Sequence, residues 1–310
     1  MKHRFQSVRD YEVQPGLVKG LVENMRNSGG FQASQLGKGA EIISKIWYND
    51  ECTSILSFTA DIVSTGVRGV IRQVVREGLV DLIITTCGTL DHDIARSLGD
   101  YMEGDFMLDD ATLLKKGFHR LGNVIIPKEN YGPSIERFMK ELLNEKYSDA
   151  SEPIPPHQII WEAGKKLNES SILYWAYRNK VPVIVPGIMD GAFGSQLWLF
   201  YQSHRKFQID MMQDQQLMAD TVFSSKKLGA LILGGGIAKH HTIWWAQFKS
   251  GLDYAVYVTT ASEYDGSLSG AQLREAISWS KIKPKAKQVT IIGDATIVFP
   301  LLASAALKKE

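Results

Sequence analysis

The chain is poor in cysteine, and this limits the chemistry open to it. Cys52 and Cys87 are its two cysteines among 310 residues, and they form no CxxC pair. Disulfide frameworks are typical of small secreted domains, so we expect both thiols to be free. The seven histidines show no zinc-ligand spacing, and the neighbours His240 and His241 would point in different directions on a helix. The sequence therefore predicts no metal site.

Long apolar runs and a large net charge are also missing. No run approaches the roughly 20 residues of a membrane-spanning helix, and the opening segment MKHRFQSVRDYE lacks the apolar core of a secretion signal. The net charge of +1 gives no bulk attraction to nucleic acid or to a membrane surface. We therefore expect a cytoplasmic protein that binds neither nucleic acid nor membranes.

What the chain does contain is a repeated alternation of short apolar runs and helical patterns. The predicted helices include Leu17–Arg26, Leu36–Tyr48, Asp61–Gly78 and Ser171–Asn179. The predicted strands are Ile55–Thr59, Val80–Thr86, Asn123–Ile126, Val181–Val185, Ala230–Leu233, Tyr254–Val258 and Gln288–Ile292. This order indicates an α/β fold: a doubly wound, mainly parallel Rossmann-like sheet with helices on both faces and an N-terminal helical extension.

The length of the chain allows one large α/β domain or two small ones. The polar segment Tyr147–Pro156 is the best candidate for an exposed connection, but the runs on both sides of it look like parts of one sheet. We therefore expect residues 1–310 to form a single domain. Residues 1–15 are polar and aperiodic, which predicts a flexible arm.

Small and polar residues follow the predicted strands. In a doubly wound sheet, ligands bind beyond the carboxyl ends of the strands, where hydroxyl and amide groups can bind phosphate and an aspartate can hold a ribose hydroxyl. The fingerprint GxGxxG is missing, so the glycine triplet is equally compatible with a tight turn and with a phosphate site. The clusters are Thr59–Ser64, Thr86-Cys87-Gly88, Asp190-Gly191, Gly234-Gly235-Gly236, Thr260-Ala261 and Asp294-Ala295.

A second pattern, DGSLSGAQLREAISWSK, ends at Lys281. A glycine- and serine-rich loop opens a short helical pattern with Glu275 and Trp279 on one face, and Pro284 predicts that Lys281 lies at or beyond the helix end. A neutral lysine amine beside a tryptophan and a carboxylate suits imine chemistry. A solvated lysine at a helix C-terminus, where the dipole favours any cation, also explains the spacing, and spacing alone favours this second interpretation.

Several long motifs occur in order along the chain. In the C-terminal half they are LILGGGIAKHH, YAVYVTTASEYDGSLSGAQLREAISWSKIK and IIGDATIVFPLL. Upstream they are GGFQASQLGKGAEII, TTCGTLDHD, RLGNVIIPKENY and PGIMDGAFG. Together they closely resemble the deoxyhypusine synthases of the archaeal type, and they cover nearly the whole chain apart from roughly its first dozen residues.

The resemblance implies an NAD-dependent aminobutyl transferase. Such an enzyme takes the 4-aminobutyl group of spermidine, keeps it as an imine on a lysine, and passes it to a specific lysine of the translation initiation factor five A precursor. Family members are homotetramers with sites between subunits, so the same assembly is expected here.

The resemblance also assigns roles to residues of this chain. Lys281 would be the nucleophile, with His240, Glu275 and Trp279 as its catalytic companions. The spermidine set would be Asp91, His92, His240, Gly266, Ser267, Glu275 and Trp279. The NAD set would be Asp61, Ser64, Thr86, Cys87, Gly88, Asp190, Gly235, Thr260, Ala261, Asp294 and Ala295.

Several positions depart from the family pattern. Ser195 and Leu268 stand where many members have an aspartate, His92 where a glutamate is usual, Trp244 where an asparagine is common, and Asp61 where the family often has asparagine. Fewer acids leave the exact polyamine open. Two other interpretations therefore remain: a homospermidine synthase-like enzyme that passes the aminobutyl group to putrescine, and a non-catalytic NAD-binding paralogue.

Overall fold

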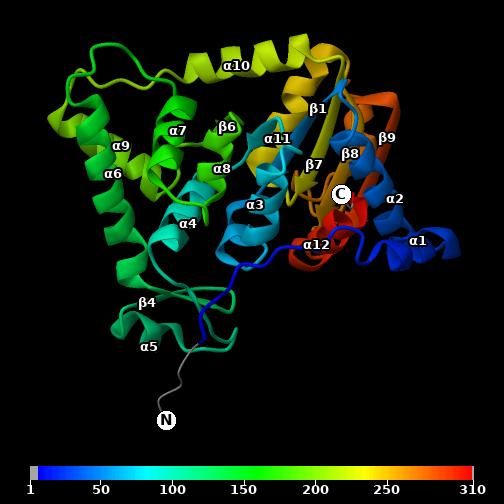
Figure 1. The fold of residues 1–310 in the computed structure, drawn as a ribbon, viewed down its shortest axis with the longest axis horizontal. Coiled ribbons are helices and arrows are strands. Elements are labelled where there is room, and N and C mark those ends of the chain that lie inside the picture. Colours follow the sequence, from blue (N-terminus) through cyan, green and yellow to red (C-terminus); the bar gives the residue numbers. More distant parts are fainter. Residues whose placement is uncertain (1–5, 309–310) are drawn as a thin grey trace.

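A six-stranded parallel sheet forms the centre of the computed structural model, which describes residues 6–308 (Figure 1). The strand order is β6-β2-β1-β7-β8-β9, and every neighbouring pair is parallel. From β1 the chain adds β2 and β6 on one side and later β7, β8 and β9 on the other, so the topological switch point lies between β1 and β7. The strands are β1 (Cys52–Phe58), β2 (Leu82–Ile84), β6 (Val183–Ile184), β7 (Lys227–Leu233), β8 (Leu252–Thr259) and β9 (Ile282–Ile292).

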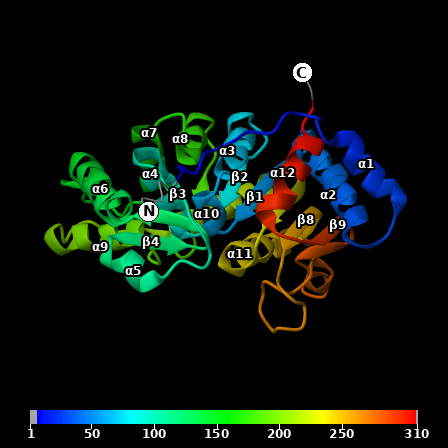
Figure 2. The ribbon, with the colours of Figure 1, turned by 90° about the horizontal axis from the view of Figure 1, so that it is seen from below.

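Both faces of this sheet are buried. Leu56 and Leu231 belong to one apolar cluster, whereas their strand neighbours Ile55 and Ala230 belong to a second. Successive side chains of a strand point to opposite faces, so each cluster occupies one face. Helices α2, α3 and α12 cover the first face, and α10 and α11 cover the second (Figure 2). The predicted doubly wound α/β fold is confirmed.

The α-helices of the described residues surround the sheet and build a helical lobe beside β6. None of them combines the length and the apolar character that a bilayer-spanning helix needs. The two N-terminal helices precede β1, as the predicted helical extension requires. The helices are α1 (Lys19–Ser28), α2 (Phe31–Trp47), α3 (Arg68–Arg76), α4 (Cys87–Leu98), α5 (Asp110–Lys115), α6 (Gly132–Tyr147), α7 (Pro156–Lys166), α8 (Ile172–Arg178), α9 (Ala192–Ser203), α10 (Met211–Ser224), α11 (Gly236–Ala246) and α12 (Ala295–Ala306).

One predicted strand belongs to a different sheet. Residues 123–126 were expected in the parallel series, but β5 (Val124–Pro127) pairs antiparallel with β3 (Met102–Glu103) and β4 (Phe118–Leu121). A two-residue turn joins β4 to β5, since Leu121 pairs with Val124, and Gly122 within it has a φ of +60°. Such a turn reverses the chain at once, which leaves no room for the crossover that a parallel strand requires.

The helix predicted over Asp61–Gly78 is broken into two pieces. A 3-10 helix, η1 (Ala60–Ser64), precedes α3, and Thr65 between them is extended. A β-carbon on Gly69 would lie 2.2 Å from the carbonyl oxygen of Tyr11, so the N-terminal segment passes directly over this part of the chain. The arm thus packs against the first turn of α3.

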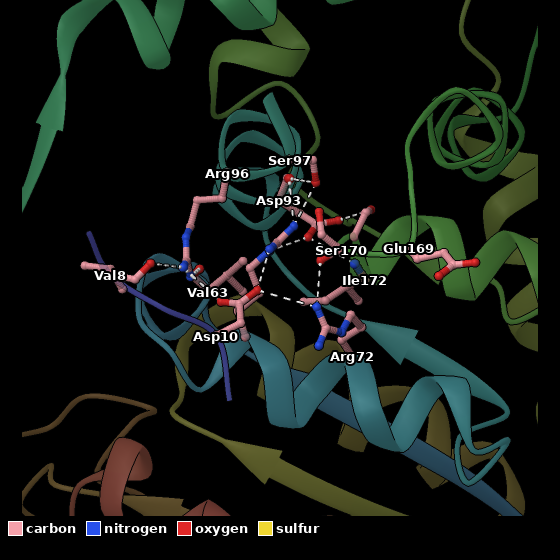
Figure 3. A network of polar contacts seen from close by, with 12 residues as sticks. Val8, Asp10, Val63, Arg72, Asp93, Arg96, Ser97, Glu169, Ser170 and Ile172 are labelled. Atoms are coloured by element: carbon pink, nitrogen blue, oxygen red, sulfur yellow. Dashed lines mark hydrogen bonds and ion pairs between the residues drawn. The ribbon is translucent and has the colours of Figure 1, made fainter. Parts of the chain in front are cut away.

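That arm, expected to be flexible, is anchored over residues 6–15, and residues 1–5 lie outside the described part. Asp10 forms ion pairs with Arg68 at 2.6 Å and with Arg96 at 2.9 Å (Figure 3). Arg68 is 2% exposed and also bonds Asp93 at 2.7 Å. Asp93 in turn accepts the backbone N–H groups that begin α8, from Ile172 and its successor. The network joins the arm to α3, α4 and α8.

Candidate active site

The backbone of Lys281 is held at the junction of a short helix and β9. The helix predicted to carry Glu275 and Trp279 is a 3-10 helix, η4 (Leu273–Ile277), so the expected α-helical i, i+4 pair was wrong. Ser280 has a φ of +56°, and its N–H and that of Lys281 return to the carbonyls of residues 277 and 276, which ends the helix in a Schellman-type turn. Lys281 does lie beyond the helix end, and its carbonyl accepts a bond from the N–H of residue 252 in β8.

The side chain of Lys281 is buried between two tryptophans. It is 8% exposed, and its amine lies 5.3 Å from the ring centre of Trp279 and 5.4 Å from that of Trp244. The alternative of a solvated lysine at a helix end therefore does not describe this residue. Trp279 and Trp244 are themselves 65% and 43% exposed, so the outer faces of both rings are open in the single chain.

A cavity of about 190 Å³ opens beside this amine. Lys281, Glu275, Trp279 and His240 all contribute to its wall, so four residues predicted to act together do lie together. The volume is below the range of roughly 300–1,000 Å³ that drug-sized ligands occupy, which suits a small linear molecule. A larger cleft of about 810 Å³ lies between α1, α2 and α12, but it contains none of these residues.

A second lysine in this cavity was missed at the level of sequence. Lys239 is 2% exposed, and its amine donates to the carbonyl oxygens of Leu268, at 2.8 Å, and Ala271. The amine also lies 3.9 Å from the ring centre of Tyr257. Burial lowers the pKa of Lys239 to about 8, against the opposing charge of Glu275. Lys239 thus ties the glycine- and serine-rich loop to α11. The one sequence signal that could have indicated Lys239 is its place beside His240 in the motif LILGGGIAKHH.

His240 occupies the second turn of α11, facing the same cavity. Its ring lies 5.6 Å from that of Trp244. Burial, followed by the charge of Lys281, lowers the pKa of His240 below its ordinary value, so the imidazole is neutral at pH 7 and can accept a proton. The ring of His241 contacts Trp245 instead, and His241 does not line this cavity.

The polar clusters at the carboxyl edge of the sheet also come together. The N–H of Thr59 donates to the carbonyl of Leu233, and that of Gly234 to the carbonyl of Val258, so the loops after β1, β7 and β8 are adjacent. On the other side, a β-carbon on Gly88 would lie 2.9 Å from that of Ala60. One on Gly191 would lie 2.6 Å from the sulfur of Cys87. The loops therefore form one continuous edge.

Individual members of the predicted NAD set differ in what they offer to a ligand. Asp61, Asp190, Thr260 and Asp294 are exposed at this edge, although the Asp294 carboxylate accepts the N–H of Thr296 at the start of α12. Four other members of the set are partly exposed: Thr86, Gly88, Ala261 and Ala295.

Three members of that set are buried. The Ser64 hydroxyl donates to the carbonyl of Asp61 within η1, so it is already used inside the protein. Burial raises the pKa of Cys87 to about 12, which argues against a thiolate nucleophile. Gly235 packs against Ser269, where a β-carbon would lie 2.2 Å from the hydroxyl oxygen.

Asp91 and His92 lie in α4 and line no part of the Lys281 cavity in this chain. Asp91 is 1% exposed and accepts the N–H groups of Ala192 and Phe193 at the start of α9, together with the hydroxyl of Tyr131. Burial, the largest effect, raises the pKa of Asp91 in spite of these donors. Asp91 and Asp93 thus each anchor the N-terminus of a later helix, a role that the sequence did not reveal.

The His92 ring is 8% exposed and bonds the hydroxyl of Tyr101 at 3.0 Å. Burial, followed by the charge of Arg96, lowers the pKa of His92 to about 4. A neutral, buried imidazole does not replace the charge of a carboxylate.

The other departures from the family pattern fall in two places. Leu268 lines the Lys281 cavity, and Trp244 covers the Lys281 amine. Ser195 lies on α9, where its hydroxyl donates to the carbonyl of Gly191. Gly266 and Ser267 are exposed in the loop before Leu268. Among residues 6–308, no three His, Cys, Asp or Glu side chains group as metal ligands do.

Comparison with known proteins shows the family to which the chain belongs. A sequence model described as deoxyhypusine synthase matches residues 20–306. The chain is 51% identical over 292 residues to a probable deoxyhypusine synthase of Picrophilus torridus, covering 94% of this chain and 93% of the relative. It is 52% identical over 286 residues to one of Thermoplasma volcanium, with 92% of each chain covered.

A solved structure agrees as well. The crystal structure of a putative deoxyhypusine synthase from Entamoeba histolytica superposes with a TM-score of 0.63 at 25% identity, over 92% of this chain and 91% of that one. The family match, the two close relatives and the shared fold all extend over nearly the whole chain. The chain therefore belongs to the deoxyhypusine synthase family.

Proposed function

We propose that this chain transfers the 4-aminobutyl group of spermidine to a specific lysine of the translation initiation factor five A precursor, with NAD as its cofactor. The observation that carries the proposal is the Lys281 amine, buried between two tryptophan rings at the wall of a small cavity. A neutral amine at such a place attacks an imine and keeps the alkyl group. The rings and the burial exclude the water that would hydrolyse the product.

The carboxyl edge of the sheet suits NAD. The turn after β7 is built from glycines with φ values of +80° at Gly234 and +66° at Gly236, and no atom lies within 4 Å of a β-carbon placed on Gly236. The first turn of α11 has no side-chain cap, so its N–H groups are available to a diphosphate. Exposed carboxylates at this edge, Asp61 and Asp190 among them, would hold ribose hydroxyls. When bound, NAD would accept a hydride from the donor and later return it.

The residues around Lys281 would divide the remaining tasks. His240, neutral at pH 7, would take the proton that the donor's secondary amine releases. Glu275 would hold the terminal ammonium of the retained aminobutyl group. Trp279 and Trp244 would enclose its four carbons. Lys239 would keep the loop that closes the cavity in place.

Two copies of the chain would build each complete site. Leu252 pairs with Ile282 and Thr259 with Ile292, so Lys281 and Asp294 lie at opposite ends of β9, roughly 25 Å apart along the sheet. The open faces of Trp244 and Trp279 are suited to cover by a neighbouring chain. Such a pairing would bring Lys281 of one copy to the cofactor edge of another, within a homotetramer.

The mass of the protein acceptor tests this function. We expect the factor precursor to gain one aminobutyl group after incubation with the chain, NAD and spermidine. Lys281→Arg should abolish the gain, because a guanidinium cannot lose its proton to become a nucleophile. Lys283→Arg is the matched control, because Lys283 pairs with Asp253 outside the cavity, and it should leave the gain intact. An unmodified factor, with the aminobutyl group found on free putrescine, would indicate the homospermidine synthase-like reaction instead.

A further inference from the structure

The wall of the Lys281 cavity carries little negative charge. Among its described lining residues, Glu275 is the one carboxylate, whereas Lys239, Lys281 and His240 are nitrogen bases. The Lys239 amine is held by two carbonyls and contributes a fixed positive group. A second free ammonium in this cavity would find no further acid in the same chain and would face that lysine, which is unfavourable in a partly dry site.

The part of the wall around Leu268 is apolar. Leu268 lines the cavity together with Ile243, Leu273 and Ala276, and its carbonyl is the acceptor of the Lys239 amine. An alkyl group placed against these side chains would be removed from water favourably, by roughly 0.8 kcal/mol for each buried CH₂. An ammonium in the same place would lose its hydration without gaining a partner. The cavity therefore matches a ligand with one charged end and one apolar end.

The chemistry of the transfer decides which part of the donor is the charged end and which is the apolar end. The aminobutyl group must stay in place while the amine that it was joined to departs, so its ammonium is the one that needs a fixed partner. Glu275 provides that partner. The departing amine then leaves past Leu268, and no described residue of this chain's wall there selects for a charge on it.

We propose that the chain takes N-alkyl-1,4-diaminobutanes as aminobutyl donors, irrespective of a charge on the alkyl end, so that spermidine is one member of a wider substrate class. This inference rests on the proposed function. In the step concerned, the Lys281 amine adds to the C=N bond of the oxidised donor, R–N=CH–(CH₂)₃–NH₃⁺. The bond from that carbon to R–N breaks, a new C=N bond to Lys281 forms, and R–NH₂ leaves after its nitrogen has taken both hydrogens of the neutral Lys281 amine. For spermidine R is aminopropyl; for N-propyl-1,4-diaminobutane the leaving group is propylamine.

The test compares these two donors on the full-length protein with excess NAD. Borohydride reduction stops the reaction, the mass of the protein reports the trapped adduct, and chromatography identifies the released amine. We expect the same aminobutyl adduct from both donors, with half-saturating concentrations within about threefold of each other. Release of propylamine in an amount equal to the adduct would confirm the balance of the step.

Two variants at Leu268 test whether the apolar wall determines the preference between the two donors. Leu268→Asp adds a carboxylate to the apolar wall and should favour spermidine by about tenfold, corresponding to about 1.4 kcal/mol. Leu268→Asn has nearly the same shape without the charge and should leave the ratio of the two donors unchanged.

A wild-type preference for spermidine above about tenfold would overturn the inference, as would an equal shift in both variants. The wild-type comparison decides the matter even if a variant does not fold. Failure of both donors to form an adduct would instead refute the proposed function, and the inference with it.

Discussion

Replacing Asp93 by asparagine should remove much of the stability that joins α3, α4 and α8. Asp93 is fully buried, and its two carboxylate oxygens accept four donors: Arg68, the hydroxyl of Ser171 and the N–H groups of Ile172 and Leu173. Each oxygen accepts one of those N–H groups. The amide NH₂ of asparagine would take the place of one of these oxygens. At either position this NH₂ donor would then face a backbone N–H donor.

The magnitude follows from what remains of the network. Breaking a buried ion pair by removing one partner costs about 3–5 kcal/mol, because the other charge stays buried. Arg68 keeps its ion pair with Asp10 at 2.6 Å, so the lower end of this energy range applies. We expect Asp93→Asn to lower the free energy of unfolding by about 3 kcal/mol. Urea denaturation at a fixed protein concentration measures it, since assembly makes apparent stability concentration-dependent.

Asp109→Asn is the matched control, because Asp109 caps the N-terminus of α5 at an exposed position. Its effect should be clearly smaller, since water can replace the lost interactions. A loss below about 1 kcal/mol for Asp93→Asn, or equal losses for the two variants, would refute the reasoning from buried charge.

Three further changes test other parts of the account. Ser280→Gly should stabilise the protein by about 0.5 kcal/mol, since relief of the left-handed backbone outweighs the added freedom of the unfolded chain, whereas Ser280→Val should destabilise it; thermal melting compares them. His92 has a folded pKa of about 4 against an ordinary 6.5, so the unfolded state binds the proton first and stability is lost as the pH falls below 6.5. His92 should account for about 2 kcal/mol of the stability lost from pH 7 to pH 5, so the loss should be smaller by about that amount in His92→Gln; an unchanged pH dependence would contradict this. Gly235→Ala should lower adduct formation on Lys281, because the new methyl group would displace Ser269. Gly20→Ala is the control, since no atom lies within 4 Å of a β-carbon placed there. Equal activity of the two variants would count against a role for the Gly235–Ser269 contact.

The central sheet was predictable because its strands are buried on both faces. Continuous apolar runs such as those in β7 and β8 are typical of parallel strands that are covered on both faces. Hydrophobicity alone predicts the wrong sheet for the strand near residue 125, because it does not show that the Gly122-Asn123 turn reverses the chain. A turn of two residues sets the direction of a strand as firmly as its hydrophobicity sets its burial.

The candidate site was predictable in its members but not in its geometry. Motifs indicated Lys281, His240, Glu275 and Trp279, and these do share one cavity wall. The helix that was expected to bring Glu275 and Trp279 together ends earlier, because Ser280 adopts a left-handed conformation that no residue pattern required.

Long-range contacts set the roles that were missed. Lys239 acts through carbonyls some 30 residues away in sequence, and Asp91 through N–H groups about 100 residues away. Local patterns carry no information on such partners.

The most direct test of the account is to find which lysine carries the trapped aminobutyl group. Lys239 is the natural rival, because it shares the cavity and burial lowers its pKa to about 8, but two carbonyls hold its amine. The wild-type protein is incubated with spermidine and NAD, reduced with borohydride and digested, and the modified peptide is sequenced by mass spectrometry. The whole adduct should be found on Lys281. An adduct on Lys239, or on neither lysine, would contradict it.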